Sequence, residues 1–260
     1  MKSKNFVSRV TSSIKGWLKK SFKLTIYHLT KRRFLHLICK EVDEEKIKKQ
    51  IQPDFTLSIV AVSYERLGEL KVFVQSVINQ TRNNWKLHVL HDGYNADFCN
   101  IMEEYKRDNP KQISYECTKT RFNDYGHSLR EIGLEKATGE YILITNADNY
   151  YSPKGLEFIN KAIVNNTSKP DIVMFDMVHS HANPGLRKAP RYSFFKVIYK
   201  RNFIDMGAAV VETSLAKRSG FADKSYSADA TFFENILKKK LESGSRLIVA
   251  KIPSVLLVHN

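Results

Sequence analysis

The sequence has few cysteines and no long apolar runs. No stretch free of Lys, Arg, Asp and Glu exceeds ten residues, whereas a helix that crosses a bilayer needs about 20 apolar residues. We therefore expect no transmembrane helix, and we expect no secretory signal because no apolar segment of sufficient length follows the first lysines. Three scattered cysteines without CxxC spacing argue against a disulfide framework and a cysteine zinc site, and they favour a reducing compartment: Cys39, Cys99 and Cys117.

Several common catalytic and phosphate-binding motifs are also missing. The chain has no GxxxxGK[ST] and no GxGxxG, which are the signatures of P-loop ATPases and dinucleotide dehydrogenases. It has neither GxSxG nor HExxH. Hydrophobic residues make up 42% and charged residues 27%, close to ordinary globular proteins, so wholesale disorder is excluded.

Acidic residues are absent from the first 40 positions. Residues 1–40 hold 11 Lys and Arg and no Asp or Glu, although the whole chain has 42 basic and 27 acidic residues and a net charge of +15. Subtracting the 11 basic residues of the arm leaves 31 basic and 27 acidic residues in 41–260, a net charge of +4. We therefore expect a cationic arm (1–40), a charged linker (41–54) and a nearly neutral body (55–260). A nucleic-acid binder would be more uniformly basic, so no nucleic-acid partner is expected.

The arm is predicted to be an amphipathic helix. At 100° per residue its apolar side chains share one arc, and most of its basic side chains lie on the other side. This pattern is typical of a helix in an anionic membrane interface, where each cation contributes about 1 kcal/mol. It places the protein in the cytoplasm, peripheral on the inner face of the membrane. A helix packed on the body and a mitochondrial presequence remain alternatives. The residues are Phe6, Val7, Val10, Ile14, Trp17, Leu18 and Phe22, with Arg9, Lys15, Lys19, Lys20 and Lys23 opposite.

From Phe55 onward, strand patterns alternate with helix patterns. Compact apolar runs predict buried strands, and apolar residues at helical spacing predict helices between them. This order indicates an α/β fold with a mainly parallel sheet covered by helices on both faces. Ligands of such sheets bind at the carboxyl ends of the strands. The expected strands are 57–62, 87–90, 113–115, 141–144 and 172–175, and the expected helices lie around 67–78, 101–105, 129–134, 153–163 and 232–237.

Two acids follow expected strands, where βα loops should begin. Asp92 lies in His91-Asp92-Gly93, and Asp148 lies in Asn146-Ala147-Asp148. A carboxylate there can accept hydrogen bonds from a base or ribose, or hold a divalent cation. Mg²⁺ often keeps only one or two protein carboxylates besides substrate phosphates, so Asp148 alone would suffice. The alternative is that both acids cap helices.

Two histidines offer a second candidate metal site. His179 and His181 lie near Asp176 in the sequence, and imidazole and carboxylate groups are common metal ligands. The alternative is that these histidines lie in a solvated loop that holds no ion.

The order of motifs resembles the family 2 glycosyltransferases, nucleotide-sugar enzymes with the GT-A fold, over roughly Phe55 to Asn260. The chain departs from the family pattern where Asn146, Asn149, Ala228 and His91 replace acids that are frequent there. The resemblance is carried by 57–64, Ser76 to Thr81, His91-Asp92-Gly93, Gly126 and Arg130 with 137–142, Asn146 to Asn149, and 207–221 followed by Ala228-Asp229.

This resemblance implies an inverting transfer of a sugar, most simply from a UDP-sugar, to a hydroxyl of a glycan or lipid-linked acceptor. The pathway would be synthesis of a surface polysaccharide, such as lipopolysaccharide or capsule. Asp148 would hold Mg²⁺ or Mn²⁺, and Asp229 would be the general base. For Arg130 a surface salt bridge is the alternative, and a basic loop at 187–191 would either cover the diphosphate or be solvated. The implied nucleotide-sugar site is Ala61, Ser63, Asp92, Arg130, Asn146, Ala147 and Asp148.

Two other classes of function remain as alternatives. A nucleotidyltransferase would share the sheet and the metal, but it normally needs a Gly-rich basic loop after the first strand, and residues 62–67 do not form one. A non-enzymatic protein that binds membranes or nucleic acid would explain the arm. The nearly neutral body and the acids Asp148 and Asp229 argue against it.

We expect deletion of residues 1–40 to abolish binding to anionic vesicles and to leave the body folded and able to bind nucleotide. The reason is that the excess positive charge and the amphipathic arc are confined to those residues. Co-sedimentation with vesicles, before and after the deletion and over a range of salt, measures this. Unchanged, salt-insensitive binding of the shortened chain would contradict the expectation.

Overall fold

The computed structural model describes residues 55–185 and 187–260, which belong to one compact α/β unit. The expected arm and linker, residues 1–54, lie outside the described residues. Within the described part of the chain, no helix combines the length and the apolarity that a membrane span requires.

The five strands expected from the sequence are all present. Four of them are mostly buried, β3 at the edge of the sheet is only partly buried, and β1 is buried along its whole length because strands flank it on both sides. This explains why it appears in the sequence as a continuous apolar run. The strands are β1 (Leu57–Ser63), β2 (Trp85–His91), β3 (Ile113–Cys117), β4 (Tyr141–Asn146) and β6 (Ile172–His179).

Four further strands complete the sheet, whose order is β3-β2-β1-β4-β8-β6-β9-β5, with β7 paired to β6. The short β8 runs antiparallel between β4 and β6, while β9 runs parallel to β6. The carboxyl ends of β1, β2, β3, β4, β6 and β9 therefore lie at one edge. The sheet is mainly parallel, as expected, with antiparallel strands added. These additional strands are β5 (Tyr150–Tyr151), β7 (Ser193–Phe195), β8 (Ala209–Glu212) and β9 (Val249–His259).

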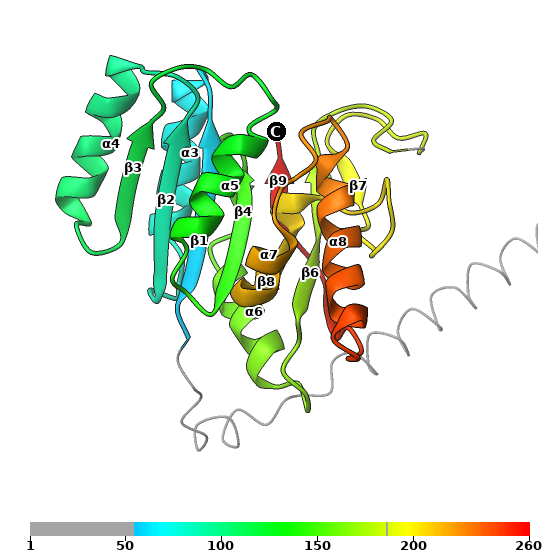
Figure 1. The fold of residues 1–260 in the computed structure, drawn as a ribbon. Helices are drawn as coiled ribbons and strands as arrows, with labels where there is room; N and C mark the ends of the chain where they lie inside the picture. Colours follow the sequence, from blue (N-terminus) through cyan, green and yellow to red (C-terminus); the bar gives the residue numbers. More distant parts are fainter. Residues whose placement is uncertain (1–54, 186) are drawn as a thin grey trace, which may run out of the picture. The chain divides into compact units, whose positions relative to one another are not determined.

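Helices cover both faces of the sheet. Figure 1 shows α5, α7 and α8 in front of the sheet, with α3 and α6 behind it. Helix α3 buries an apolar stripe, as the helical spacing predicted, which consists of Leu70, Phe73, Val74 and Val77. The helices are α3 (Leu67–Ile78), α4 (Ala96–Asp108), α5 (His127–Lys136), α6 (Gly155–Val164), α7 (Thr213–Ser219) and α8 (Ala228–Glu242), with a 3-10 turn η1 (Met206–Ala208) before β8.

Helix α5 packs very closely on the sheet. A Cβ atom added at Gly133 would overlap Cγ1 of Val60 in β1 and would lie 3.1 Å from Cδ1 of Leu90 in β2. At the start of the helix, Gly126 has φ +80° and lies under Val62, a conformation that glycine adopts without strain. Two glycines therefore set the depth at which α5 and its side chains sit above the strand ends.

We expect Gly133→Ala to lower the free energy of unfolding by about 1–3 kcal/mol, because the added methyl group overpacks a buried interface. The matched control is Gly68→Ala in α3, where an added Cβ meets nothing within 4 Å. That variant should be neutral or up to about 1 kcal/mol more stable, since alanine favours a helix. Urea denaturation of both variants measures the difference. Equal stability of the two would show that α5 does not pack this closely.

Candidate active site

A buried arginine forms the centre of the site. Arg130 in α5 is 5% exposed. Its Nη2 donates to Oδ1 of Asn146 at 2.7 Å, and its Nη1 lies 2.8 Å from Nδ1 of His127 and 3.5 Å from Oδ1 of Asp229. One guanidinium therefore joins the end of β4 to the start of α8. The alternative of a surface salt bridge is wrong for Arg130, because the side chain lies inside the protein.

His127 supports this arginine as a neutral ring. Burial and the neighbouring Arg130 charge lower the pKa of His127. Because a guanidinium can only donate, Nδ1 of His127 must accept the hydrogen bond. The ring also stacks on Phe221, with centroids 6.2 Å apart. His127 thus holds Arg130 in place without adding positive charge.

Asp229 lies in the first turn of α8. Its side chain is 30% exposed, so it can reach both the Arg130 guanidinium and a ligand. The N-cap residue of α8 is Ser227, so Asp229 does not cap this helix. The apolar face expected behind it is buried at Phe232, Phe233 and Ile236, while Leu237 is exposed. This packing fixes the helix start that carries the carboxylate.

A second carboxylate, Asp205, lies within electrostatic reach of the same group. Its Oδ1 accepts a hydrogen bond from the N–H of Gly207 at 2.8 Å. Burial raises the pKa of Asp205, and the charge of Asp229 raises it further, while His259 and Arg130 oppose the shift. Asp205 was not among the nucleotide-binding, metal-binding or catalytic residues expected from the sequence. The only feature of the sequence that could have pointed to Asp205 is its position two residues before a glycine, and that pattern is also typical of ordinary turns.

Asp148 follows β4 and pairs with a residue that the sequence analysis missed. Its Oδ2 lies 2.6 Å from Nη1 of Arg66, in the loop after β1. Both Glu65 and Arg66 have positive φ, 51° and 46°, which is unusual for residues other than glycine. This backbone turns the Arg66 side chain toward Asp148. The loop lacks glycines, so nothing in its composition predicted this turn.

Asp148 can also serve as a cation ligand. Its Oδ1 is buried and has no hydrogen-bond partner among the described residues. The neighbouring amides are engaged, since Asn146 accepts from Arg130 and Asn149 accepts from the N–H of Asn260. One carboxylate oxygen suits Mg²⁺ or Mn²⁺, which take their other ligands from water and phosphate. The N-cap residue of α6 is Lys154, so the interpretation of Asp148 as a helix cap is wrong.

Asp92 organises the loop that follows β3. It is 6% exposed, and its oxygens accept hydrogen bonds from the N–H groups of Phe122 at 2.7 Å and Asn123 at 3.0 Å. The guanidinium of Arg121 lies 3.5 Å from this carboxylate and 3.5 Å above the ring of Tyr64. The N-cap residue of α4 is Asn95, so Asp92 is not a helix cap.

The remaining predicted nucleotide contacts lie close to the same edge. Ala61 is fully buried between β2 and β4, and the carbonyl of Ser63 accepts the N–H of Asp92 at 3.0 Å. The N–H of Ala147 donates to the carbonyl of Val62 at 2.9 Å. The structure therefore brings the predicted residues together around the ends of β1, β2 and β4. Their contacts with a nucleotide stay a prediction.

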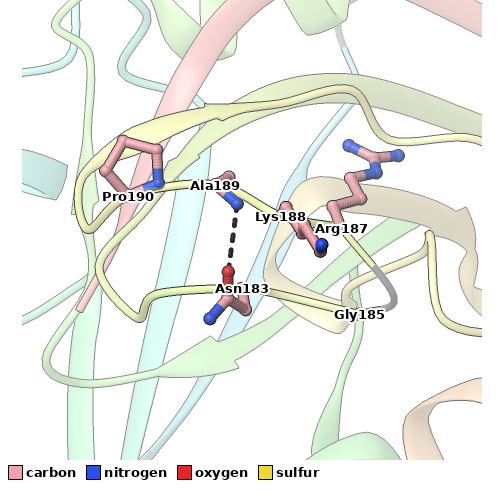
Figure 2. A pocket seen from close by; sticks show the side chains of 6 residues that line it. All are labelled: Asn183, Gly185, Arg187, Lys188, Ala189 and Pro190. Atoms are coloured by element: carbon pink, nitrogen blue, oxygen red, sulfur yellow. Dashed lines mark hydrogen bonds between the residues drawn. The ribbon is translucent and has the colours of Figure 1, made fainter.

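The basic loop between β6 and β7 is anchored by one of its arginines. The guanidinium of Arg187 lies over the rings of Phe195 and Phe203, at 4.2 and 4.4 Å, and donates to the carbonyl of Lys196 at 2.8 Å. Figure 2 shows the hollow that this loop forms, in which Oδ1 of Asn183 accepts the N–H of Ala189. Arg187 is therefore engaged in holding the loop, and Lys188 is the basic residue left lining the hollow.

We expect Arg130→Lys to lower the free energy of unfolding by about 1–3 kcal/mol, because an ammonium cannot reproduce a planar guanidinium that reaches three partners. The matched control is Arg121→Lys, whose ion pair with Asp92 is partly exposed and should change stability by at most about 1 kcal/mol. Chemical denaturation compares the two. If both variants lose the same stability, Arg130 is not the structural centre of the site.

Solved structures with low sequence identity share this fold. The S. aureus protein TarS (residues 1–349) superposes with a TM-score of 0.62 at 15% identity, covering 79% of this chain and 60% of that chain. The mannosyltransferase PcManGT from Pyrobaculum calidifontis, in complex with GDP-Man and Mn²⁺, superposes with a TM-score of 0.56 at 14% identity, covering 82% and 61%. The fold is therefore that of the GT-A glycosyltransferases.

Relatives detected by sequence cover part of the chain. An uncharacterized glycosyltransferase of Rickettsia bellii (strain RML369-C) is 31% identical over 109 residues, which are 42% of this chain and 15% of that protein. Protein CgeD of Bacillus subtilis (strain 168) is 29% identical over 105 residues, 38% of this chain and 24% of that protein. The matched segment is thus a small part of each relative. The family profile described as glycosyl transferase family 2 matches residues 58–219, more than half of the chain, and the chain therefore belongs to glycosyl transferase family 2.

Proposed function

We propose that this glycosyltransferase moves a sugar from a nucleoside-diphosphate sugar, in the first instance a UDP-sugar, to an acceptor hydroxyl with inversion. The observation that supports it best is the arrangement around Arg130, which holds Asp229 at the same sheet edge as Asp148. Such a transfer needs charge neutralisation at the leaving diphosphate and a base for the acceptor. Two separately held carboxylates fit those two tasks.

The donor side is proposed to lie over the ends of β1, β2 and β4. The backbone near Ala61, Ser63 and Ala147 would hold the nucleotide, and Asp92 would bind the base. Two relatives support a nucleotide-sugar donor, since TarS was crystallised with UDP-GlcNAc and PcManGT with GDP-Man. The same site would not suit a nucleotidyltransferase, because the loop after β1 lacks the glycine-rich basic sequence which that reaction normally uses.

The leaving diphosphate is proposed to lie beside Asp148 and Arg66. A divalent ion, Mg²⁺ or Mn²⁺, bound to the unpartnered Oδ1 of Asp148 would neutralise charge on the phosphates. Arg66 is 59% exposed and paired with the same carboxylate, so its planar guanidinium is placed to bind a phosphate oxygen. Arg130, buried beneath the surface of the site, would add positive potential while its hydrogen bond to Asn146 is kept.

The acceptor side is proposed to be at the start of α8. Asp229 would take the proton of the acceptor hydroxyl as that oxygen forms a bond to the anomeric carbon and the bond to the diphosphate breaks. Arg130 keeps the carboxylate oriented through their 3.5 Å contact. The rings of Tyr125 and Tyr226, 5.7 Å apart and 65% and 85% exposed, precede α5 and α8 and form an aromatic surface suited to a sugar ring.

The cellular role is proposed to be synthesis of a surface polysaccharide on a glycan or lipid-linked acceptor. The acid-free arm supports this role, because a cationic amphipathic helix would hold the enzyme at an anionic inner membrane face. Lipid-linked acceptors are presented at such a surface. Capsule and lipopolysaccharide synthesis are the processes that combine these requirements.

We expect Asp229→Asn to reduce the rate of transfer by about 10²-fold or more, the usual scale for loss of a general base. Donor affinity and thermal stability should stay near those of the unchanged protein, because asparagine is nearly isosteric and does not remove a helix cap. Single-turnover transfer and donor titration, made on the same preparation with a panel of nucleotide sugars, measure both quantities.

The matched control for this variant is Asp223→Asn, in the loop just before α8. Hydrogen bonds from the backbone and side chain of Ser225 and from Thr231 lower the pKa of Asp223 to about 2, which makes it a poor base. Its substitution should leave transfer within a few-fold. Near-normal transfer by Asp229→Asn would exclude Asp229 as the base, and an equal loss of transfer and of donor affinity would indicate damaged structure.

A further inference from the structure

The segment between the end of β6 and η1 carries the whole excess of positive charge in the body. Residues 177–204 hold six Lys and Arg and no Asp or Glu. Residues 55–260 have 28 basic and 22 acidic residues, and without this segment the two numbers are equal at 22. The body is therefore neutral apart from one acid-free stretch, so its positive charge is a local feature and not a general one.

Buried side chains hold this segment against β6 and α8. Strand β7 pairs with the end of β6, and the side chains of Phe195 and Val197 are buried. The N–H of Val197 donates to Oδ1 of Asp176 at 2.9 Å. Further along, Arg201 pairs with Glu234 of α8 at 2.7 Å. The segment thus has a fixed place beside the helix whose first turn carries the proposed base (Figure 1).

The other side of the segment presents large apolar side chains to solvent. Phe194, Lys196 and Ile198 alternate with the buried residues and are exposed. Tyr192 and Phe194 are 61% and 60% exposed, and Ile198 is 39% exposed. Single exposed apolar residues are common, but several of them close together on a structured segment indicate a surface that contacts a partner.

Cations without internal partners surround these apolar side chains. Arg187 and Lys200 lie over the ring of Phe203, at 4.4 and 5.6 Å, and Arg201 has its ion pair. The three other basic residues are exposed and form no ion pair with any described residue. We call this area the β7 surface, and it consists of Lys188, Arg191, Tyr192, Phe194, Lys196 and Ile198.

We propose that the β7 surface binds the headgroup region of an anionic lipid bilayer, with its apolar side chains inserted and its three unpaired cations on lipid phosphates. A mixture of aromatic, aliphatic and basic side chains on one face is typical of contacts with a membrane interface. The charge is complementary to such a surface, and the acid-free segment brings no carboxylate that would be repelled by it.

The apolar side chains favour a bilayer over the other partners of a cationic surface. A soluble anionic polymer would engage the cations but leave the phenyl and aliphatic groups in water, without the gain that burial provides. A symmetric contact between two copies of the chain would place the same basic surface on both sides, where like charges repel.

Contact through this surface would also orient the site. Because residues 199–201 lie against α8, a bilayer at the β7 surface would lie near the start of that helix. An acceptor hydroxyl carried by a lipid would then reach Asp229 at the membrane surface. Only this consequence rests on the proposed function, since binding to lipid can be measured without any reaction.

The β7 surface would act together with the expected cationic arm. Each cation near an anionic bilayer raises the affinity by about five-fold, so three raise it by about 10²-fold. A contact of this size is too weak to hold the protein on vesicles alone, which is consistent with the loss of binding expected when residues 1–40 are deleted. In the full chain both contacts would meet the same bilayer, and one would raise the effective concentration of the other.

The first test is co-sedimentation of the full chain with vesicles of phosphatidylcholine, with and without phosphatidylglycerol. We expect Lys188→Gln combined with Lys196→Gln to lower the affinity for the anionic vesicles by about 10-fold or more. The matched control combines Lys86→Gln with Lys111→Gln, two exposed lysines at the amino ends of β2 and β3, and should change the affinity by at most about two-fold. Equal losses in the two double variants would overturn the proposal.

The second test measures insertion. On binding to anionic vesicles, Phe194→Trp should show a blue-shifted emission that brominated lipids quench. The control is Phe158→Trp, whose position in α6 is 41% exposed and which should gain no such signal. Both variants share the native Trp17 and Trp85 as background. The same response in both variants would overturn the proposal.

The variant Phe194→Ser separates the bilayer from the other partners. It should lower the affinity for anionic vesicles by about 10-fold and leave the binding of soluble inorganic polyphosphate unchanged. Unchanged vesicle affinity would overturn the proposal, and so would a change of oligomeric state in sedimentation velocity, which would identify a contact between copies. No nucleotide sugar is present in these experiments, so their failure and the failure of the proposed sugar transfer are distinguishable.

Discussion

The buried guanidinium of Arg130 is the interaction on which the arrangement of the site depends. A charge removed from water costs several kcal/mol unless its donors are satisfied. Here the partners come from three elements, β4 through Asn146, α5 through His127 and α8 through Asp229. Because α5 and α8 lie on the same face of the sheet (Figure 1), the two terminal nitrogens of Arg130 meet all three of these partners only when both helices are packed there. The arrangement of the site therefore depends on the packing of that layer of helices.

Asn146 and Asn149, which stand where the family often has acids, both form hydrogen bonds in this region. Asn146 satisfies one donor of Arg130 with a neutral amide oxygen, so the full positive charge remains to act on Asp229. Asn149 is buried and bonds to Thr145 and to the N–H of Asn260. An aspartate there would place a further negative charge beside Asp148. Two amides thus leave Asp148 as the single acid of its segment.

The same edge of the sheet carries a carboxylate and a group of imidazole rings at different strand ends. Asp148 presents a carboxylate at the end of β4, and the imidazoles lie at the ends of β6 and β9. Burial and the two neighbouring rings lower the pKa of His179 to about 4, so this ring is neutral near pH 7. Asp205 lies between the two regions, since its pKa responds both to His259 and to Asp229. The charges of His259 and Asp229 therefore act on the pKa of Asp205 in opposite directions.

The sequence by itself determined the alternating strands and helices, the strand ends that carry Asp92 and Asp148, and the helix that follows Asp229 around 232–237, because each follows from a local period or a local motif. It could not determine the antiparallel β8, whose four residues are too short for a pattern, or the turn that brings Arg66 to Asp148. Nor could it bring His259 beside His179, since that contact follows from the register of β6 and β9. Tertiary structure alone decides such pairings, because they depend on which distant segments share a sheet edge.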